Sequence, residues 1–370
     1  MSRTIRKQIT IFAVSLVILL ICLGYLLIGV PWGDIGKYES YYIDDTGPPV
    51  NGAVKVTFLG TTSLLIDDGE TQLMIDGFVS RPNKCAILTS NIQTNTAAFE
   101  PVIKMLDKEH FKGLFVAHSH YDHSFDVAYI IKQTKAKLYG SRSTHNVGYG
   151  GDLKKGQMEL FEPGKELQFG KFTVTVLDAI HSSTRMPLKG TIDCPLSQPT
   201  GFTQYREGGS YDFLIKHGER TILIKPSANY CCKEGNPNNV PAEVVFLGTS
   251  GLGGRDEKFK NDYYDQNIAK DKTKLIIPMH WDDFTTPLSG HLAFPPWLID
   301  DSPAAFEFLK CRIEKSNIEK SSEREDIRFG ILQGYKSVLL FSGETQNKIP
   351  DNPNLPNCVY REGEKEAFKN

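Results

Sequence analysis

The stretch VAHSHYDHSFD, residues 116–126, constrains the fold of this chain more than any other segment, because three histidines and two aspartates fall within nine consecutive positions. It directly follows FKGLFVA, a continuous apolar run typical of a strand that is buried on both faces. The next segment, FDVAYIIKQT, returns to helical periodicity. A loop between a buried strand and a helix projects its side chains into an open crevice. We therefore expect an α/β fold with a polar cluster at one strand end.

The residue types and spacing in this loop indicate a metal site. Imidazole nitrogens and a carboxylate are ligands that zinc accepts in tetrahedral sites. A single histidine at a strand end is more often a solvated side chain. Packing does not explain an H-x-H-x-D-H pattern, however, because clustered imidazoles need a shared cation or repel one another when protonated. The ligands predicted in this loop are His118, His120, Asp122 and His123.

Two further histidines end apolar runs in the same manner. His181 follows VTVLDAI, and His280 follows KLIIPM. Three strand ends that all carry histidine indicate one convergent site. The remaining histidines lack this context, and we interpret them as ordinary surface or loop residues: His110, His145, His217 and His291.

The rest of the chain predicts a layered α/β architecture. Short apolar segments separated by glycine or acidic turns are typical of strands, and they are found at 53–60, 63–69, 71–77, 171–180, 210–218, 220–227, 242–250 and 273–280. Helical stretches are expected near 261–271 and 303–318. Two strand-rich halves with helices between them predict a sandwich of two sheets with helices outside.

The N-terminus predicts a membrane anchor over residues 1–32. Residues 9–30 form an uncharged run of 22, whereas a bilayer core needs about 20 apolar residues and a signal-peptide core about 7–15. Three basic residues, Arg3, Arg6 and Lys7, precede the run, so the N-terminus is expected in the cytoplasm. We expect a single-pass signal anchor with the catalytic domain outside, in the periplasm or the extracellular space. A cleaved signal peptide is the alternative.

Composition sets the remaining boundaries and excludes one class of partner. Residues 33–52 are expected to be a linker, 53–345 the catalytic domain and 346–370 a polar tail. A formal charge of −2 gives no electrostatic support for nucleic-acid binding.

An even number of cysteines in an exported domain permits disulfides, and the six beyond the anchor are Cys85, Cys194, Cys231, Cys232, Cys311 and Cys358.

The histidine pattern resembles the metallo-β-lactamase superfamily. The resemblance rests on HSHYDH at 118–123, on His181 and His280 downstream, and on LMIDG with Asp76 upstream, and it covers roughly residues 53–342. The pattern looks most like the branch that contains ascorbate-phosphate lactonases and the phospholipase D that cleaves N-acyl phosphatidylethanolamines. The resemblance implies an αββα sandwich of two mixed β-sheets flanked by helices, here preceded by the transmembrane helix.

The same resemblance implies how the ligands divide. The first metal would be bound by His118, His120 and His181. The second would be bound by Asp122, His123 and His280. Asp76 would be a buried residue that supports the metal loops, and zinc would be the metal, as one or two ions, with manganese or iron as alternatives.

One position departs from the family pattern. Members usually carry a glycine-aspartate pair whose carboxylate bridges both metals, where RTILIKPSANY here has Pro226 and Ser227. A serine hydroxyl is a poor zinc ligand unless it is ionised. Either one metal is held firmly and another weakly, or a nearby acid substitutes, with Asp282 and Asp283 as candidates.

These features predict a membrane-anchored, metal-dependent hydrolase. A metal-bound hydroxide would attack an ester, lactone or phosphodiester bond, and Asp122 would orient the water or carry its proton to the leaving group. The alternative is a catalytically silent metal-binding sensor or scaffold with a degenerate second site. The expected substrate is a small or lipid-like molecule. The apolar loop HLAFPPWLIDD (291–301) either packs onto the core of the domain or forms a lid that faces a bilayer, and such a lid would admit a lipid-like substrate.

Overall fold

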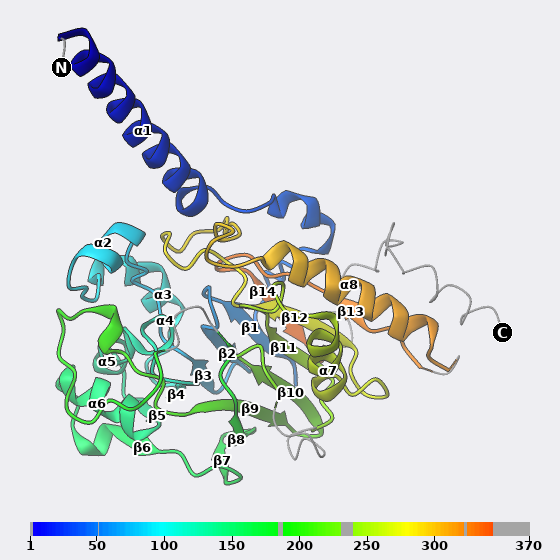
Figure 1. Cartoon of the computed structure of the whole chain (residues 1–370). Coiled ribbons are helices and arrows are strands. Elements are labelled where there is room, and N and C mark those ends of the chain that lie inside the picture. Colours follow the sequence, from blue (N-terminus) through cyan, green and yellow to red (C-terminus); the bar gives the residue numbers. More distant parts are fainter. Residues whose placement is uncertain (1–2, 51, 184–187, 231–239, 322–323, 343–370) are drawn as a thin grey trace.

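The computed structural model describes residues 3–50, 52–183, 188–230, 240–321 and 324–342 and shows two β-sheets packed face to face (Figure 1). The first sheet has seven strands in the order β14-β1-β2-β3-β4-β5-β6. Its strands are β1 (Val54–Phe58), β2 (Leu64–Asp67), β3 (Gln72–Ile75), β4 (Phe111–Phe115), β5 (Lys137–Gly140), β6 (Met158–Leu160) and β14 (Ser337–Leu340). The second sheet has seven strands in the order β13-β12-β11-β10-β9-β8-β7. They are β7 (Glu166–Phe169), β8 (Phe172–Ala179), β9 (Ser210–His217), β10 (Arg220–Lys225), β11 (Val244–Gly248), β12 (Leu275–Met279) and β13 (Arg328–Phe329).

Both sheets are mixed and share one pattern of pairing. In the first sheet β14, β1, β2 and β3 pair antiparallel, and β3 to β6 pair parallel. In the second sheet β7 to β10 pair antiparallel, and β10 to β13 pair parallel. The predicted pair of mixed sheets is confirmed.

The helices cover the outer faces of the sandwich (Figure 1). On the side of the first sheet lie α2 (Lys84–Thr89), α3 (Glu100–Met105), α4 (Tyr121–Ser124), α5 (Val127–Lys132) and α6 (Arg142–Gly150). On the side of the second sheet lie α7 (Glu257–Asn267) and α8 (Ser302–Ile318). Four short 3₁₀ turns complete the described elements: η1 (Ile35–Tyr41), η2 (Thr96–Phe99), η3 (Lys155–Gln157) and η4 (Phe202–Gln204).

The alternation of side chains along the first sheet explains why both of its faces are buried. Leu64 and Ile66 of β2 pack into the core between the sheets, whereas Leu65 packs under the helices on the other face. Phe115 and Leu114 of β4 divide in the same way. Successive side chains of a strand point to opposite faces, so an all-apolar strand is stable only between two apolar layers.

The N-terminal helix α1 (Arg3–Gly29) covers most of the expected membrane anchor. It stands away from the sandwich (Figure 1), and its described side chains between Ile9 and Leu19 are exposed. Among the residues that the structure describes, no helix has the length and apolar character that a membrane crossing requires. The predicted membrane-spanning helix within residues 1–32 is therefore not confirmed.

The segment expected to be a linker packs onto the domain over its first half. Tyr38 of η1 makes edge-on contacts with Phe294 and Phe306, at ring-centroid distances of 5.8 and 5.2 Å. Its hydroxyl donates a 2.7 Å hydrogen bond to Oε1 of Glu307 in α8. The amide of Ile43 donates to the carbonyl of Ile331 at 2.9 Å. Residues 33–43 are thus part of the folded body.

The cysteines divide into two kinds within the described residues. Cys311 of α8 is disulfide-bonded, whereas Cys85 and Cys194 are free and exposed. Cys231, Cys232 and Cys358 lie outside the described residues, as does the predicted polar tail at 346–370.

Candidate metal centre

The loop after β4 carries His118 and His120, and hydrogen bonds from its backbone amides hold it open. The amide of Ala117 donates to Oδ1 of Asp76 at 2.8 Å, and the amide of Ser119 donates to the carbonyl of Glu207 at 2.8 Å. His120 has extended backbone angles and precedes the first turn of α4. The chain therefore changes from strand to helix within this loop.

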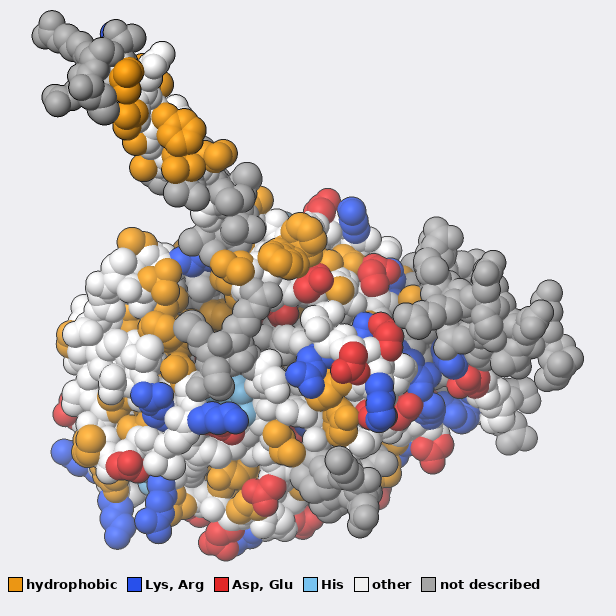
Figure 2. All heavy atoms as spheres, in the orientation of Figure 1, with side chains coloured by type: hydrophobic (Ala, Val, Ile, Leu, Met, Phe, Trp, Pro, Cys, Tyr) orange, Lys and Arg blue, Asp and Glu red, His pale blue; other side chains and the backbone are white. Residues whose placement is uncertain are grey.

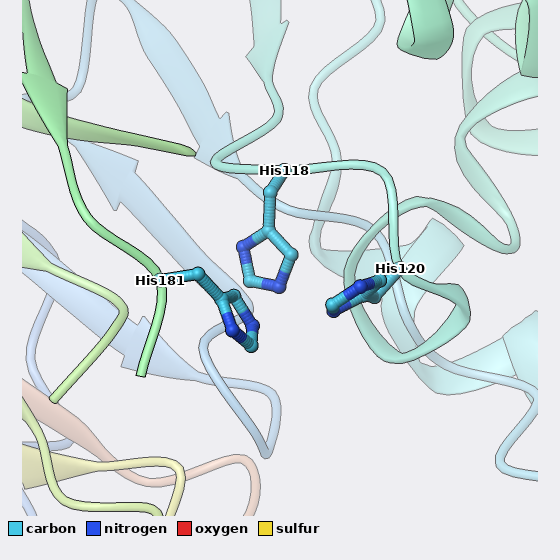
Figure 3. A group of neighbouring side chains, drawn as sticks. All are labelled: His118, His120 and His181. Carbon is cyan, nitrogen blue, oxygen red and sulfur yellow. The ribbon is translucent and has the colours of Figure 1, made fainter. Parts of the chain in front are cut away.

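Three histidines converge as the sequence predicted. The ring nitrogens of His118, His120 and His181 lie within 4.8 Å of one another, and the three rings point toward a common space (Figure 3). The first two come from the loop after β4, and His181 comes from the end of β8 in the other sheet. Pairwise ring-centroid distances are 4.5 to 4.7 Å. This group brings together ligands from both sheets.

The hydrogen bonds of these rings identify which nitrogens are available to a metal. Nε2 of His120 lies 3.1 Å from the carbonyl oxygen of Leu188, and Nδ1 of His181 lies 2.7 Å from that of Ser182. A carbonyl only accepts, so these nitrogens carry the protons and the opposite nitrogens have free lone pairs. Both ring nitrogens of His118 are buried without a hydrogen-bond partner among the described residues. A buried polar atom without a partner is costly, and a metal ion removes that cost.

Asp122, His123 and His280 form a second group of ligands, whose ligand atoms also lie within 4.8 Å of one another. Oδ2 of Asp122 is 3.3 Å from Nε2 of His280 and 3.8 Å from Nε2 of His123. Nε2 of His123 has no hydrogen-bond partner among the described residues. His280 follows β12 and has a positive φ of 57°, and its amide donates to the carbonyl of Thr61 at 2.6 Å.

Asp76 supports the second group. Its Oδ2 accepts hydrogen bonds from Nδ1 of His123 at 2.8 Å and from the hydroxyl of Thr62 at 2.5 Å. The carboxylate therefore orients the imidazole so that Nε2 faces the site. The structure thus agrees with the role that the resemblance implied for Asp76. Sequence reasoning missed Thr62, although a polar pair in the turn between two predicted strands was the available signal.

The charges of the site suit metal binding at neutral pH. Burial, followed by the charges of the neighbouring histidines, lowers the pKa of His118 well below its usual range, and the same causes lower the pKa of His181 to about 3. Burial alone would raise the pKa of Asp122, but cationic His123 and the hydrogen bond from His280 hold it well below its usual range. Neutral imidazoles and an ionised carboxylate are the forms that bind metals, so His118, His181 and Asp122 are ready to bind. Burial lowers the pKa of His123, but Asp76 and Asp122 raise it overall, so His123 must release its proton when a metal binds.

The structure does not support the alternative in which Asp282 or Asp283 substitutes for the bridging acid. Asp282 forms a fully buried ion pair with Arg81 and accepts from the amide of Thr61 at 2.8 Å. Asp283 pairs with Lys84 at 2.6 Å and accepts from Thr285. Both carboxylates are already neutralised, and neither belongs to a ligand group. Within the described residues, the position of the bridging acid retains only the Ser227 hydroxyl.

The two ligand groups open into one cavity of about 480 Å³. Its polar end is lined by His118, His120, Asp122, His181, His280 and Ser227. The histidines interpreted as ordinary do not take part: His217 pairs with Asp68 at 3.0 Å, and His110 pairs with Asp107 at 3.0 Å. The donor set and its unpartnered buried nitrogens fit a bound metal.

Part of the chain is similar in sequence to known metal-dependent hydrolases. Residues 56–215 match the model of the metallo-beta-lactamase superfamily. A UPF0173 metal-dependent hydrolase of Anaeromyxobacter sp. is 31% identical over 164 residues, which are 43% of this chain and 53% of that protein. A UPF0173 metal-dependent hydrolase of Staphylococcus aureus is 23% identical over 236 residues, covering 62% of this chain and 87% of the relative. The chain thus spans about half the length of the first of these relatives.

A metallo hydrolase from the archaeon Ignicoccus hospitalis is 16% identical, with a TM-score of 0.48, and the match covers 78% of this chain and 98% of that one. Residues 56–215 thus match the metallo-beta-lactamase superfamily, and the two mixed sheets and the two ligand groups agree with the fold that this resemblance implied. The finer assignment to the lactonase and phospholipase D branch stays a prediction.

Proposed function

We propose that the protein is a metal-dependent hydrolase that cleaves an ester, lactone or phosphodiester bond. The observation that carries this proposal is the convergence of the six predicted ligands into two groups, five of whose members line one end of a single cavity. The names of the relatives, metal-dependent hydrolases, support it. The substrate would reach the ligands through the cavity.

Asp122 has the geometry and charge of the catalytic base. A metal bound here supplies a Lewis acid and a water molecule of lowered pKa. The Asp122 carboxylate is ionised and lies beside His280, so it would orient such a water and accept its proton. It would then deliver the proton to the leaving oxygen. The other ligand side chains fix the position of the reacting groups.

Zinc is the proposed metal because five imidazoles and one carboxylate make up the two ligand groups found among the described residues. Manganese or iron is compatible with the same ligand types. The three-histidine group would hold one ion firmly. The second group would hold its ion more weakly, because Ser227 offers no carboxylate between the two groups.

Ser227, which stands at the position of the bridging acid, also supports a second candidate function. This function is a catalytically silent metal-binding sensor or scaffold. Metal content separates the two when the wild type is measured beside Ser227→Asp. Close to two metals per chain in the wild type supports the hydrolase. One metal or fewer, rising toward two in the variant, favours a degenerate site.

Hydrolysis is tested with Asp122→Asn, which keeps the size of the side chain and removes its basic carboxylate. We expect zinc-dependent turnover of p-nitrophenyl acetate or bis(p-nitrophenyl) phosphate by the wild type, and a loss of at least about 10²-fold in the variant. Asp152→Asn is the control, because the Asp152 side chain is 84% exposed and is absent from both ligand groups. Equal turnover in all three proteins would refute the assignment of Asp122.

We also propose that α1 holds the domain at a membrane, with the N-terminus in the cytoplasm and the hydrolase domain outside. Support comes from the basic residues before the apolar run, from the position of α1 away from the sandwich and from the disulfide-bonded Cys311. Exposed Cys85 and Cys194 provide the test, since a membrane-impermeant thiol reagent should label them in intact cells. Labelling only after lysis would contradict this orientation.

A further inference from the structure

Away from its metal-ligand end, the cavity has an apolar wall built on three edge-on aromatic contacts. The ring of Phe284 lies 5.7 Å from that of His280 and 6.2 Å from that of Tyr121. Tyr121 in turn lies 5.7 Å from Phe202. The aromatic wall therefore begins at a metal ligand and runs outward along the cavity.

Aliphatic side chains supply further parts of the lining. Ile87 and Leu88 come from α2, and Leu188 comes from the segment whose carbonyl holds His120. Leu88 is 64% exposed, so the apolar lining reaches the surface. Figure 2 shows hydrophobic side chains gathered over α2, on the face where histidine side chains are visible.

The lining offers little charge to an anionic group at a distance from the metal ligands. Among the described residues that line the cavity, Lys84 is the one basic side chain other than histidine. Its ammonium lies 2.6 Å from Oδ2 of Asp283, so an acid of the protein already pairs with it. A nucleotide or a sugar phosphate would place its charge against hydrocarbon here, which costs free energy.

We propose that this wall is an acyl-chain site, and that the substrates are esters or lactones with an uncharged, linear hydrocarbon chain. The chain would lie along Phe284, Tyr121 and Phe202 and leave the cavity past Leu88. The inference rests on the proposed hydrolase function and specifies its substrate class. In the reaction, the oxygen of water bonds to the acyl carbon and the acyl–oxygen bond breaks. The leaving oxygen takes a proton, and the products are a carboxylic acid and an alcohol from an ester, or a single hydroxy acid from a lactone.

Binding of hydroxamic acids tests the chain site without requiring turnover. Acetohydroxamic and octanohydroxamic acid share a metal-binding head and differ by six methylenes, and calorimetry on the zinc-loaded full-length chain gives both dissociation constants. Each fully buried methylene is worth roughly fourfold in affinity. We expect the octanoyl compound to bind at least about tenfold more tightly, because part of its chain leaves the cavity. Equal affinities would overturn the proposal.

A matched pair of surface substitutions locates the effect. Leu88→Gln removes an apolar side chain from the cavity mouth, whereas Ile318→Gln changes an equally exposed side chain (63% against 64%) that does not line the cavity. Glutamine is chosen because a carboxylate at this position would compete for Lys84. We expect Leu88→Gln to weaken octanohydroxamate binding about threefold to tenfold with little effect on acetohydroxamate. A similar change in both variants would contradict the assigned path.

Turnover of p-nitrophenyl esters separates this proposal from the proposed function. A rise in kcat/KM from acetate to octanoate supports both. Turnover that does not change with chain length leaves the hydrolase in place and overturns the chain site. Selective binding of the octanoyl hydroxamate without turnover of any ester supports the chain site and counts against the hydrolase.

Discussion

Replacing Asp76 with asparagine isolates the contribution of one buried carboxylate to the second ligand group. Asp76 is fully buried, has φ 52°, and holds His123 through a 2.8 Å hydrogen bond. Asparagine tolerates the left-handed backbone conformation and keeps an acceptor for the amide of Ala117. The variant therefore changes the charge beside Nδ1 of His123 while the loop keeps its shape.

The expected size of the effect follows from the role of that charge. Burial lowers the pKa of His123 and Asp76 raises it, with the net result raised, so the carboxylate makes the ring more basic. Without the negative charge Nε2 is a weaker ligand. Loss of such an outer partner costs about 10–100-fold in metal affinity, which is about 1.4–2.7 kcal/mol. Only the zinc affinity of the weaker site should fall, because the three-histidine group does not contact Asp76.

Competition with a chromophoric chelator measures both sites, and Asp126→Asn is the matched control. Asp126 is equally buried and accepts from the amides of Val79 and Ser80 and from the hydroxyl of Thr94, without a histidine partner. We expect the control to lose stability and keep its zinc affinities. The reasoning is refuted if Asp76→Asn retains wild-type affinity at both sites, or if the two variants lose zinc equally.

Three further measurements follow from the same contacts. The pKa of His181 is about 3 in the folded state and about 6.5 unfolded, so the unfolded chain binds the extra proton between these values. Metal-free protein should lose stability in thermal melts as pH falls from about 6.5 toward 3, and His181→Gln should reduce that slope. Arg81→Met leaves Asp282 buried without its partner and should cost about 3–5 kcal/mol in urea unfolding, whereas Lys104→Ala in an exposed pair should cost less than about 1 kcal/mol. Tyr38→Ala removes the ring packed between Phe294 and Phe306 and should cost about 3–5 kcal/mol by the same unfolding assay.

The sequence predicted which residues converge, because their signal is local. His118, His181 and His280 each follow an apolar run that ends at a sheet edge, so a strand pattern and one residue type were enough. The two candidate bridging acids lacked such a signal. Asp282 is neutralised by Arg81, which precedes it by 201 residues, and no local pattern reports a pairing over that separation.

Residues 33–43 show a different limit of prediction from the sequence. They lack the 3.6-residue periodicity of an α-helix, which suggested a linker. Tyr38 and Tyr41 are nevertheless both buried, and their spacing of three matches the 3₁₀ helix in which side chains at i and i+3 align. The start of α7 was also missed, because Asp256 caps the helix by accepting from the amide of Phe259 in a stretch without an apolar stripe.

Each ligand group takes side chains from both sheets, and this links metal binding to the stability of the whole domain. His181 from the second sheet completes the group begun by His118 and His120, and His280 completes the group begun by Asp122 and His123. A metal held between the sheets binds the folded state alone. It should therefore raise the free energy of unfolding by about 2.7 kcal/mol at a free concentration of one hundred times Kd.

Chelator titration during urea unfolding tests this coupling. We expect one cooperative transition that moves to lower urea when the metal is removed, with an unchanged m value, because both sheets lose the same link. A metal-dependent shift confined to one of two separate transitions would mean that the sheets unfold independently, and that the ligands of each group converge without joining them.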